Sequence, residues 1–143
     1  MYKKVLLPIS LDHPESWKKA LPEASALVRA SEGELHIMTV VPDFGMASLQ
    51  DFFPDDFEAK ALSKAKADID ALASTEVEEG VKFETHLGHG SVVEHVLDMA
   101  AQLEVDLIVL ASHQPDRMRE FLVGSNADKI VHRSPVSVLV TRG

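Results

Sequence analysis

Cysteine is absent from this sequence of 143 residues. Disulfide bonds, thiol redox chemistry and zinc sites built on cysteine are therefore excluded. The chain is long enough to bury roughly two-thirds of its unfolded surface, so it needs no such crosslink to fold. We expect a single domain, residues 1–143, and the lack of cysteine is compatible with the reducing cytosol.

Long apolar runs are also missing. No stretch approaches the ~20 consecutive apolar residues that span a bilayer. The run that follows Lys3 and Lys4 extends only from Val5 to Ile9, which is too short for the core of a signal peptide and predicts a β-strand instead. We therefore expect no membrane span and a cytoplasmic location.

Positive charge is scarce. Lys and Arg together number 14 against 23 Asp and Glu, for a formal net charge of −9. This balance opposes a broad contact with a phosphate backbone, so no nucleic-acid partner is expected. A single small anion can still be bound, because backbone N–H groups at a helix start need no positive side chains.

Strand and helix patterns alternate along the chain. The predicted strands are 5–9, 35–41, 81–86, 106–110 and 136–141, and the predicted helices are 16–30, about 18 residues from Phe57, 91–103 and 125–133. This alternation predicts a parallel sheet with helices on both faces. The third strand alternates apolar and polar residues, so it is expected to be half exposed at a sheet edge.

Several residues predict where the helices begin and end. Ser16 is a candidate cap for the first helix, and Pro22 should bend that helix or shift its start. Gly33 is the expected C-terminal cap. Ser91 and Glu94 have the spacing of a capping box, after a predicted turn at residues 88–90.

The most informative stretch lies between Val105 and Gly143. A buried strand leads into a polar loop from Ala111 to Arg119, and a helix follows that opens with Gly124-Ser125-Asn126. Open α/β sheets bind ligands at the carboxyl ends of their strands. A Gly-Ser pair at a helix start predicts a phosphate cradle, although the pair can equally be an ordinary start with Ser125 as its cap.

The chain resembles the universal stress proteins of the UspA superfamily, and most of all their small single-domain F and G branch. The segments that carry the resemblance are KKVLLPIS, TVVP, LGHGSVVEHVLDMA, DLIVLASHQPD and FLVGSNADKIVHRSPVSVLVTR. The resemblance implies an open five-stranded parallel sheet of order 3-2-1-4-5 with helices on both faces, a Rossmann-like fold of the adenine nucleotide alpha hydrolase-like type. It also implies a homodimer or tetramer formed through the last strand.

The resemblance further implies a site for ATP or another adenine nucleotide. In such a site Pro8 and Ser10 would flank the nucleoside, the backbone of Val40 would meet the adenine, and Gly90 would line the pocket. The ribose and phosphates would be held by Ala111, Gln114, Gly124, Ser125 and Asn126. A homo-oligomeric sensor or signalling protein with at most slow ATP hydrolysis is the function this implies.

The sequence departs from the family pattern at three positions. The family's signature is Gly-x-x-Gly, nine residues, then Gly-Ser or Gly-Thr, and here Ala111 and Gln114 replace the first two glycines. Glycine would let the backbone approach a phosphate closely. Ser10 also stands where many ATP-binding relatives have Asp. The alternative function is therefore a nucleotide-independent interaction protein of the same fold, using its dimer surface and the Phe52-Phe53 loop.

Charged residues in the loop after the fourth predicted strand allow two interpretations. Arg117 or Arg119 could pair with phosphate oxygens, or the loop could simply be solvated. His113 is not expected to act as a general base, because no partnered nucleophile or orienting carboxylate is recognisable near it. A hydrolase or transferase is accordingly disfavoured.

Two further groups invite a metal interpretation. His86 and His89 have an H-x-x-H spacing, but they fall across a strand end and a turn and lack evident further ligands, so zinc is not favoured. Asp51, Asp55 and Asp56 could hold a Mg²⁺ that accompanies the nucleotide, or they could be a solubilising acidic loop. No metal-binding residue is assigned.

Overall fold

The structure is a computed structural model that describes residues 1–41, 57–112 and 125–142. Within them lies a five-stranded sheet of order β3-β2-β1-β4-β5, in which all neighbouring strands are parallel. The strands are β1 (Lys4–Pro8), β2 (Glu34–Val41), β3 (Lys82–His89), β4 (Leu107–Ser112) and β5 (Ser137–Arg142). The predicted order is confirmed, with β3 and β5 at the two edges.

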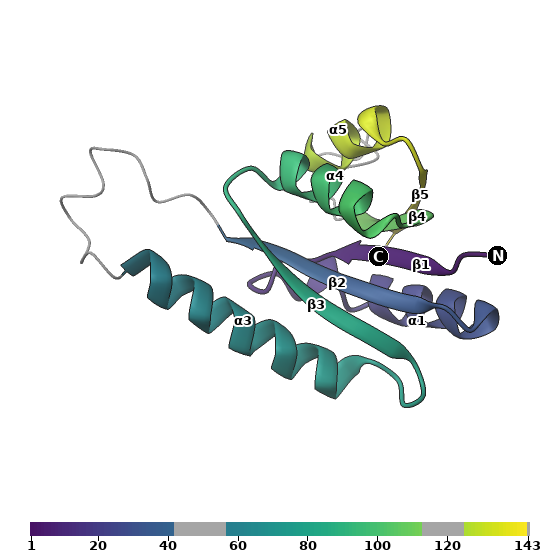
Figure 1. Ribbon diagram of the computed structural model, residues 1–143, viewed down its shortest axis with the longest axis horizontal. Coiled ribbons are helices and arrows are strands. Elements are labelled where there is room, and N and C mark those ends of the chain that lie inside the picture. Colours follow the sequence, from purple (N-terminus) through teal and green to yellow (C-terminus); the bar gives the residue numbers. More distant parts are fainter. Residues whose placement is uncertain (42–56, 113–124, 143) are drawn as a thin grey trace.

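Helices cover both faces of the sheet, as predicted (Figure 1). They are α1 (Ala20–Ser31), α3 (Phe57–Glu76), α4 (Val92–Leu103) and α5 (Ser125–Arg133), with a short 3-10 helix η1 (Pro14–Ser16) before α1. One apolar cluster packs α1 and α3 against the sheet, and a second packs α4 and α5 against the opposite face. No helix in the described part of the chain is long and apolar enough to cross a membrane.

The central strand β1 shows why the sheet strands have continuous apolar runs. Val5 and Leu7 belong to the α1–α3 cluster, whereas Leu6 between them belongs to the α4–α5 cluster. All three side chains are completely buried. A strand buried on both faces has no polar side to alternate with, which accounts for the uninterrupted run.

The first helix begins later than predicted. Ser16 does not cap it; its Oγ instead accepts a hydrogen bond from the Ser10 N–H at 2.8 Å and donates one to the Ser10 carbonyl at 3.0 Å. Because α1 begins at Ala20, Pro22 lies in the first turn, where N–H groups have no acceptor within their own helix. Pro22 thus fits a shifted helix start.

The role predicted for Gly33 is also corrected. The left-handed residue that ends α1 is Glu32, with a φ of 54°. Gly33 serves a different purpose, because a Cβ there would lie 2.4 Å from the carbonyl oxygen of Lys3. Glycine at this position lets the start of β2 lie directly against the start of β1.

Three further boundaries differ from the prediction. Ser91 precedes α4, but its side chain forms no capping hydrogen bond to any described residue, and Glu94 pairs with Arg133 at 2.7 Å instead of completing a capping box. The turn predicted at 88–90 is strand as far as His89, because β3 continues to pair with β2 up to Val41. Ala111, predicted as loop, likewise belongs to β4, which extends to Ser112.

Candidate functional site

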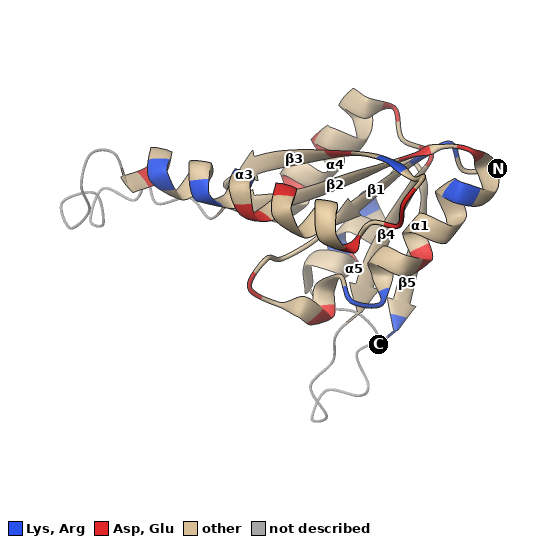
Figure 2. Cartoon of the chain, turned by 90° about the horizontal axis from the view of Figure 1, so that it is seen from below, with Lys and Arg blue, Asp and Glu red and all other residues tan. Residues whose placement is uncertain are grey.

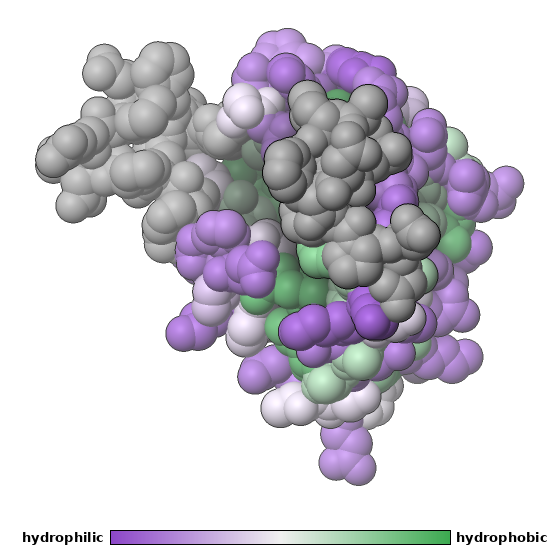
Figure 3. All heavy atoms as spheres, turned by 90° about the vertical axis from the view of Figure 1, so that its left-hand side faces the viewer, coloured by the Kyte–Doolittle hydropathy of each residue, from purple (hydrophilic) through white to green (hydrophobic). Residues whose placement is uncertain are grey.

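A cavity of about 790 Å³ opens at the carboxyl ends of β1, β2 and β4. The chain leaves β1 toward β2 on one side, while β4 pairs with the other side of β1, so strand order reverses at this point. Such a switch point is where open α/β sheets bind ligands, and the volume is within the range of small-molecule sites. Figure 3 views the molecule from this side and shows apolar surface framed by hydrophilic side chains.

Most of the described residues predicted for the site meet in this cavity. Six of them line it, namely Pro8, Ser10, Val40, Ala111, Ser125 and Asn126. Gly90 does not appear among the lining residues; it lies just beyond β3 with a φ of 105° and donates its N–H to the Val41 carbonyl at 2.9 Å. The other two predicted residues, Gln114 and Gly124, lie outside the described residues, as do Arg117 and Arg119.

The wall after β1 is held by hydrogen bonds within the loop itself. Besides the two bonds between Ser16 and Ser10, the His13 N–H donates to the Ser10 carbonyl at 3.1 Å. The Ile9 N–H donates to Met38 at 2.8 Å and ties the loop to β2. This side of the cavity is therefore held in place by hydrogen bonds of the chain itself.

Ser10 and His13 form the nearest approach to a nucleophile and base at the site. Their Oγ and Nδ1 atoms are 2.9 Å apart. In the described part of the chain no carboxylate contacts the other nitrogen of His13, and the pair is only three residues apart on one loop. This contact therefore lacks the orienting group that an activated serine requires.

Helix α3 supplies two charged residues that the sequence analysis did not assign to the site. Lys64 and Asp68 line the cavity, with Nζ and Oδ2 2.6 Å apart. Hydrogen bonding to Asp68 raises the pKa of Lys64, so this cation is firmly charged. Figure 2 shows the mixture of positive and negative residues along α3.

The start of α5 forms the opposite wall. Ile130, which is 1% exposed, anchors this helix in the cluster with Leu6 and Ile108. That anchor leaves Ser125 and Asn126 at the cavity, where the first N–H groups of a helix lack intrahelical acceptors. This wall can donate hydrogen bonds to an anion without contributing a charged side chain.

The remaining lining is largely apolar. Pro8, Met38, Val40, Val92 and Leu110 contribute aliphatic surface beside the polar groups described above. An apolar slot next to a helix N-terminus suits a ligand that combines an apolar ring with an anionic group. Asp12 and His13 also line the cavity, and neither was singled out from the sequence.

The two histidines of the H-x-x-H pattern do not face one another. His89 contacts Glu58 of α3 at 2.8 Å, whereas His86 lies against His36 of β2, with Nε2 and Nδ1 2.9 Å apart. Residues three apart on a strand point to opposite faces of the sheet. His86 and His89 therefore do not form a metal site together.

Comparison with known proteins agrees with this fold. The profile of the universal stress protein family matches residues 1–142, and the chain belongs to that family. It is 29% identical over 144 residues to universal stress protein G of Salmonella typhimurium, with 99% of this chain and 100% of that protein covered.

Solved structures share the fold over nearly the whole chain. The universal stress protein UspA of Lactobacillus plantarum has a TM-score of 0.75 at 21% identity, covering 99% of this chain and 98% of its own. The universal stress protein of Archaeoglobus fulgidus in complex with dAMP has a TM-score of 0.70 at 16% identity, with 97% of each chain covered.

Proposed function

We propose that this protein is a cytoplasmic stress-response protein that binds ATP or another adenine nucleotide in the cavity at the carboxyl ends of β1, β2 and β4. The observation that carries the proposal is the convergence of six predicted site residues on one cavity of about 790 Å³. A family member from Archaeoglobus fulgidus holds dAMP, which supports an adenine nucleotide as the ligand class.

In this proposal the adenine lies in the apolar part of the cavity, beside Val40 and Met38 of β2. The phosphates lie toward Ser125 and Asn126, because the start of α5 offers free N–H groups and the positive end of the helix dipole. Lys64 faces the same cavity, but its Nζ is paired with Oδ2 of Asp68 at 2.6 Å, so the hydrogen-bond donors for the phosphates are those of the α5 start. Asp51, Asp55 and Asp56, the candidates for an accompanying Mg²⁺, lie outside the described residues.

Isothermal titration with ATP, ADP and AMP tests the proposal. We expect Ser125→Glu to weaken binding at least about tenfold, because it places a negative charge where the phosphates are to lie. Ser74→Glu, on an exposed part of α3 away from the cavity, is the matched control and should leave affinity unchanged. Absence of binding by the unmodified protein at millimolar nucleotide would refute the proposal.

A nucleotide-independent interaction protein remains the second candidate, because Ala111 and Gln114 replace two signature glycines. Ala111 lines the cavity, so its methyl group reduces the room that glycine would leave there. The double variant Ala111→Gly, Gln114→Gly separates the candidates. If this variant binds ATP and the unmodified protein does not, the second candidate is favoured; equal affinities would mean that the replacements are no obstacle.

We also propose that the protein acts as a homo-oligomer joined through β5. This strand is at the sheet edge, where its outer backbone groups have no strand partner among the described residues. Leu139 on β5 is 38% exposed. Pairing of the same edge in two copies would satisfy the backbone groups and cover this apolar surface in an isologous dimer.

A further inference from the structure

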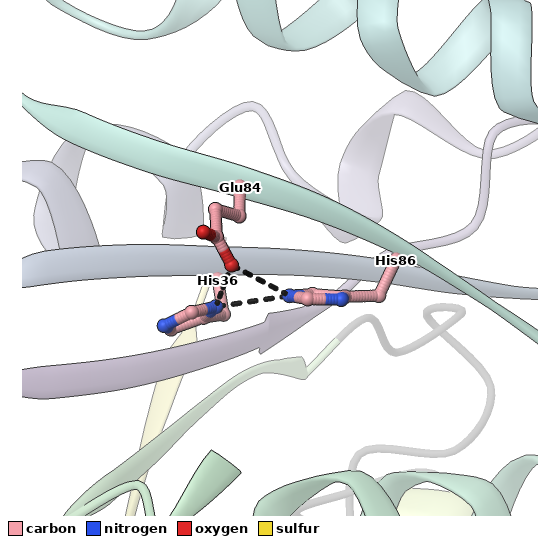
Figure 4. A group of neighbouring side chains, drawn as sticks. All are labelled: His36, Glu84 and His86. Atoms are coloured by element: carbon pink, nitrogen blue, oxygen red, sulfur yellow. Dashed lines mark hydrogen bonds and ion pairs between the residues drawn. The ribbon is translucent and has the colours of Figure 1, made fainter.

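Two histidines and a glutamate converge on the sheet face that carries α4 and α5, beside the cavity but outside its lining. His36 comes from β2, and Glu84 and His86 come from the edge strand β3, as Figure 4 shows. The register aligns His36 with Glu84 and Met38 with His86, so these side chains share one face. None of the three convergent residues lines the cavity.

Three potential ligand atoms point into the same small space. The Nδ1 atom of His36 is 2.9 Å from Nε2 of His86 and 3.6 Å from Oε2 of Glu84. The third side of the triangle, between His86 and Glu84, is 3.9 Å. Zn–N and Zn–O bonds of about 2.0–2.1 Å at tetrahedral angles separate ligand atoms by roughly 3.3 Å. Shifts of a few tenths of an ångström would bring all three into that geometry.

A fourth residue orients the buried histidine. Nε2 of His36 lies 3.0 Å from Oε1 of Glu34, and the His36 side chain is only 3% exposed. When the Nε2–H donates to this carboxylate, the lone pair of Nδ1 faces His86 and Glu84. A metal-binding histidine usually donates its second ring N–H to a carboxylate or carbonyl in this way, which fixes its tautomer.

We propose that His36, Glu84 and His86 bind a first-row divalent cation, with Zn²⁺ as the best fit, and that Glu34 is a positioning residue for His36. Two imidazoles and one carboxylate form a donor set that zinc accepts, with a fourth position left for water. Access comes from the Glu84 side, whose side chain is 68% exposed. This inference is independent of nucleotide binding.

Zinc titration of chelator-treated protein tests the site, together with the visible spectrum of the Co²⁺ form. We expect one equivalent of zinc to bind, and His86→Gln and Glu84→Gln each to weaken binding about 100-fold or more. Glu84 is exposed, so its variant should fold even if a histidine variant does not. The matched control is His132→Gln, whose side chain is 73% exposed on α5 and should leave zinc affinity unchanged.

Two additional readouts make the test specific. Glu34→Gln should weaken zinc binding about 10- to 100-fold while the four-coordinate Co²⁺ spectrum is retained. Ser125→Glu should leave zinc binding intact, so failure of the nucleotide proposal and failure of this one are distinguishable. Absence of stoichiometric zinc binding, or equal affinity in His86→Gln, would overturn the proposal and leave a hydrogen-bonded histidine pair.

Discussion

Replacing Ile130 with alanine should both destabilise the protein and disturb the cavity. Ile130 is 1% exposed, packs among Leu6, Val96 and Ile108, and also lines the cavity. Helix α5 has only nine residues, a length at which an isolated helix is not stable in water. Its position therefore depends on tertiary packing, and Ile130 is its only fully buried side chain.

The magnitude follows from the buried volume that is lost. Truncation to alanine removes three carbon atoms, worth about 0.8 kcal/mol each in transfer free energy. Incomplete closure of the resulting space adds to this, so the free energy of unfolding should fall by about 2–4 kcal/mol. Because the start of α5 would lose its anchor, we also expect nucleotide affinity to fall.

Urea denaturation followed by circular dichroism measures the first effect, and titration with nucleotide measures the second. Val131→Ala is the matched control, because it truncates the neighbouring residue of the same helix, which is 42% exposed. Both variants gain helix propensity, so comparing them removes that contribution. The reasoning would be refuted if Ile130→Ala destabilised the protein by less than about 1 kcal/mol or no more than the control.

Three further predictions concern other parts of the fold. Gly33→Ala should destabilise the protein by about 1–3 kcal/mol, because its Cβ would meet the Lys3 backbone; an unchanged thermal midpoint would contradict this. Leu139→Lys should shift sedimentation toward the monomer, whereas Phe83→Lys at the opposite edge should not; equal effects would argue against β5 as the interface. The hydrogen bond from Thr85 holds the pKa of Asp70 below its usual value, so Thr85→Val should raise that pKa in an NMR titration. Because the pKa of Asp70 is lower in the folded state, the stability from this contact is present above about pH 4 and is lost as the pH falls through the folded-state pKa. If the pKa of Asp70 in Thr85→Val equals that in the unmodified protein, the hydrogen bond from Thr85 is not the cause of the lowered pKa.

Much of the fold was predictable because its signals are local. Apolar runs such as Val5–Leu7 mark strands buried on both faces, and the alternation of strand and helix patterns predicts a parallel sheet. The motifs resembling the universal stress protein family supplied the strand order. Helix ends were less predictable, because Ser16 and Glu94 have partners in other elements that compete with capping.

The candidate site, too, was predictable only in part. The start of α5 was predictable from the Gly124-Ser125 pair, whereas the residues at the strand ends were named through the resemblance to the universal stress proteins. Lys64 and Asp68 were not predictable, because a helical pattern identifies the buried face of α3 but not which end of the sheet its solvent face borders.

The sequence by itself thus determined the order of the elements, the two-sided burial of the central strands and the end of the sheet at which a ligand is expected. These features depend on periodicity and on chain direction. Only the tertiary structure decided that His36 of β2 meets Glu84 and His86 of β3. Residues about fifty positions apart become neighbours through the register of two strands, and that register depends on how both strands pack together and not on either segment alone.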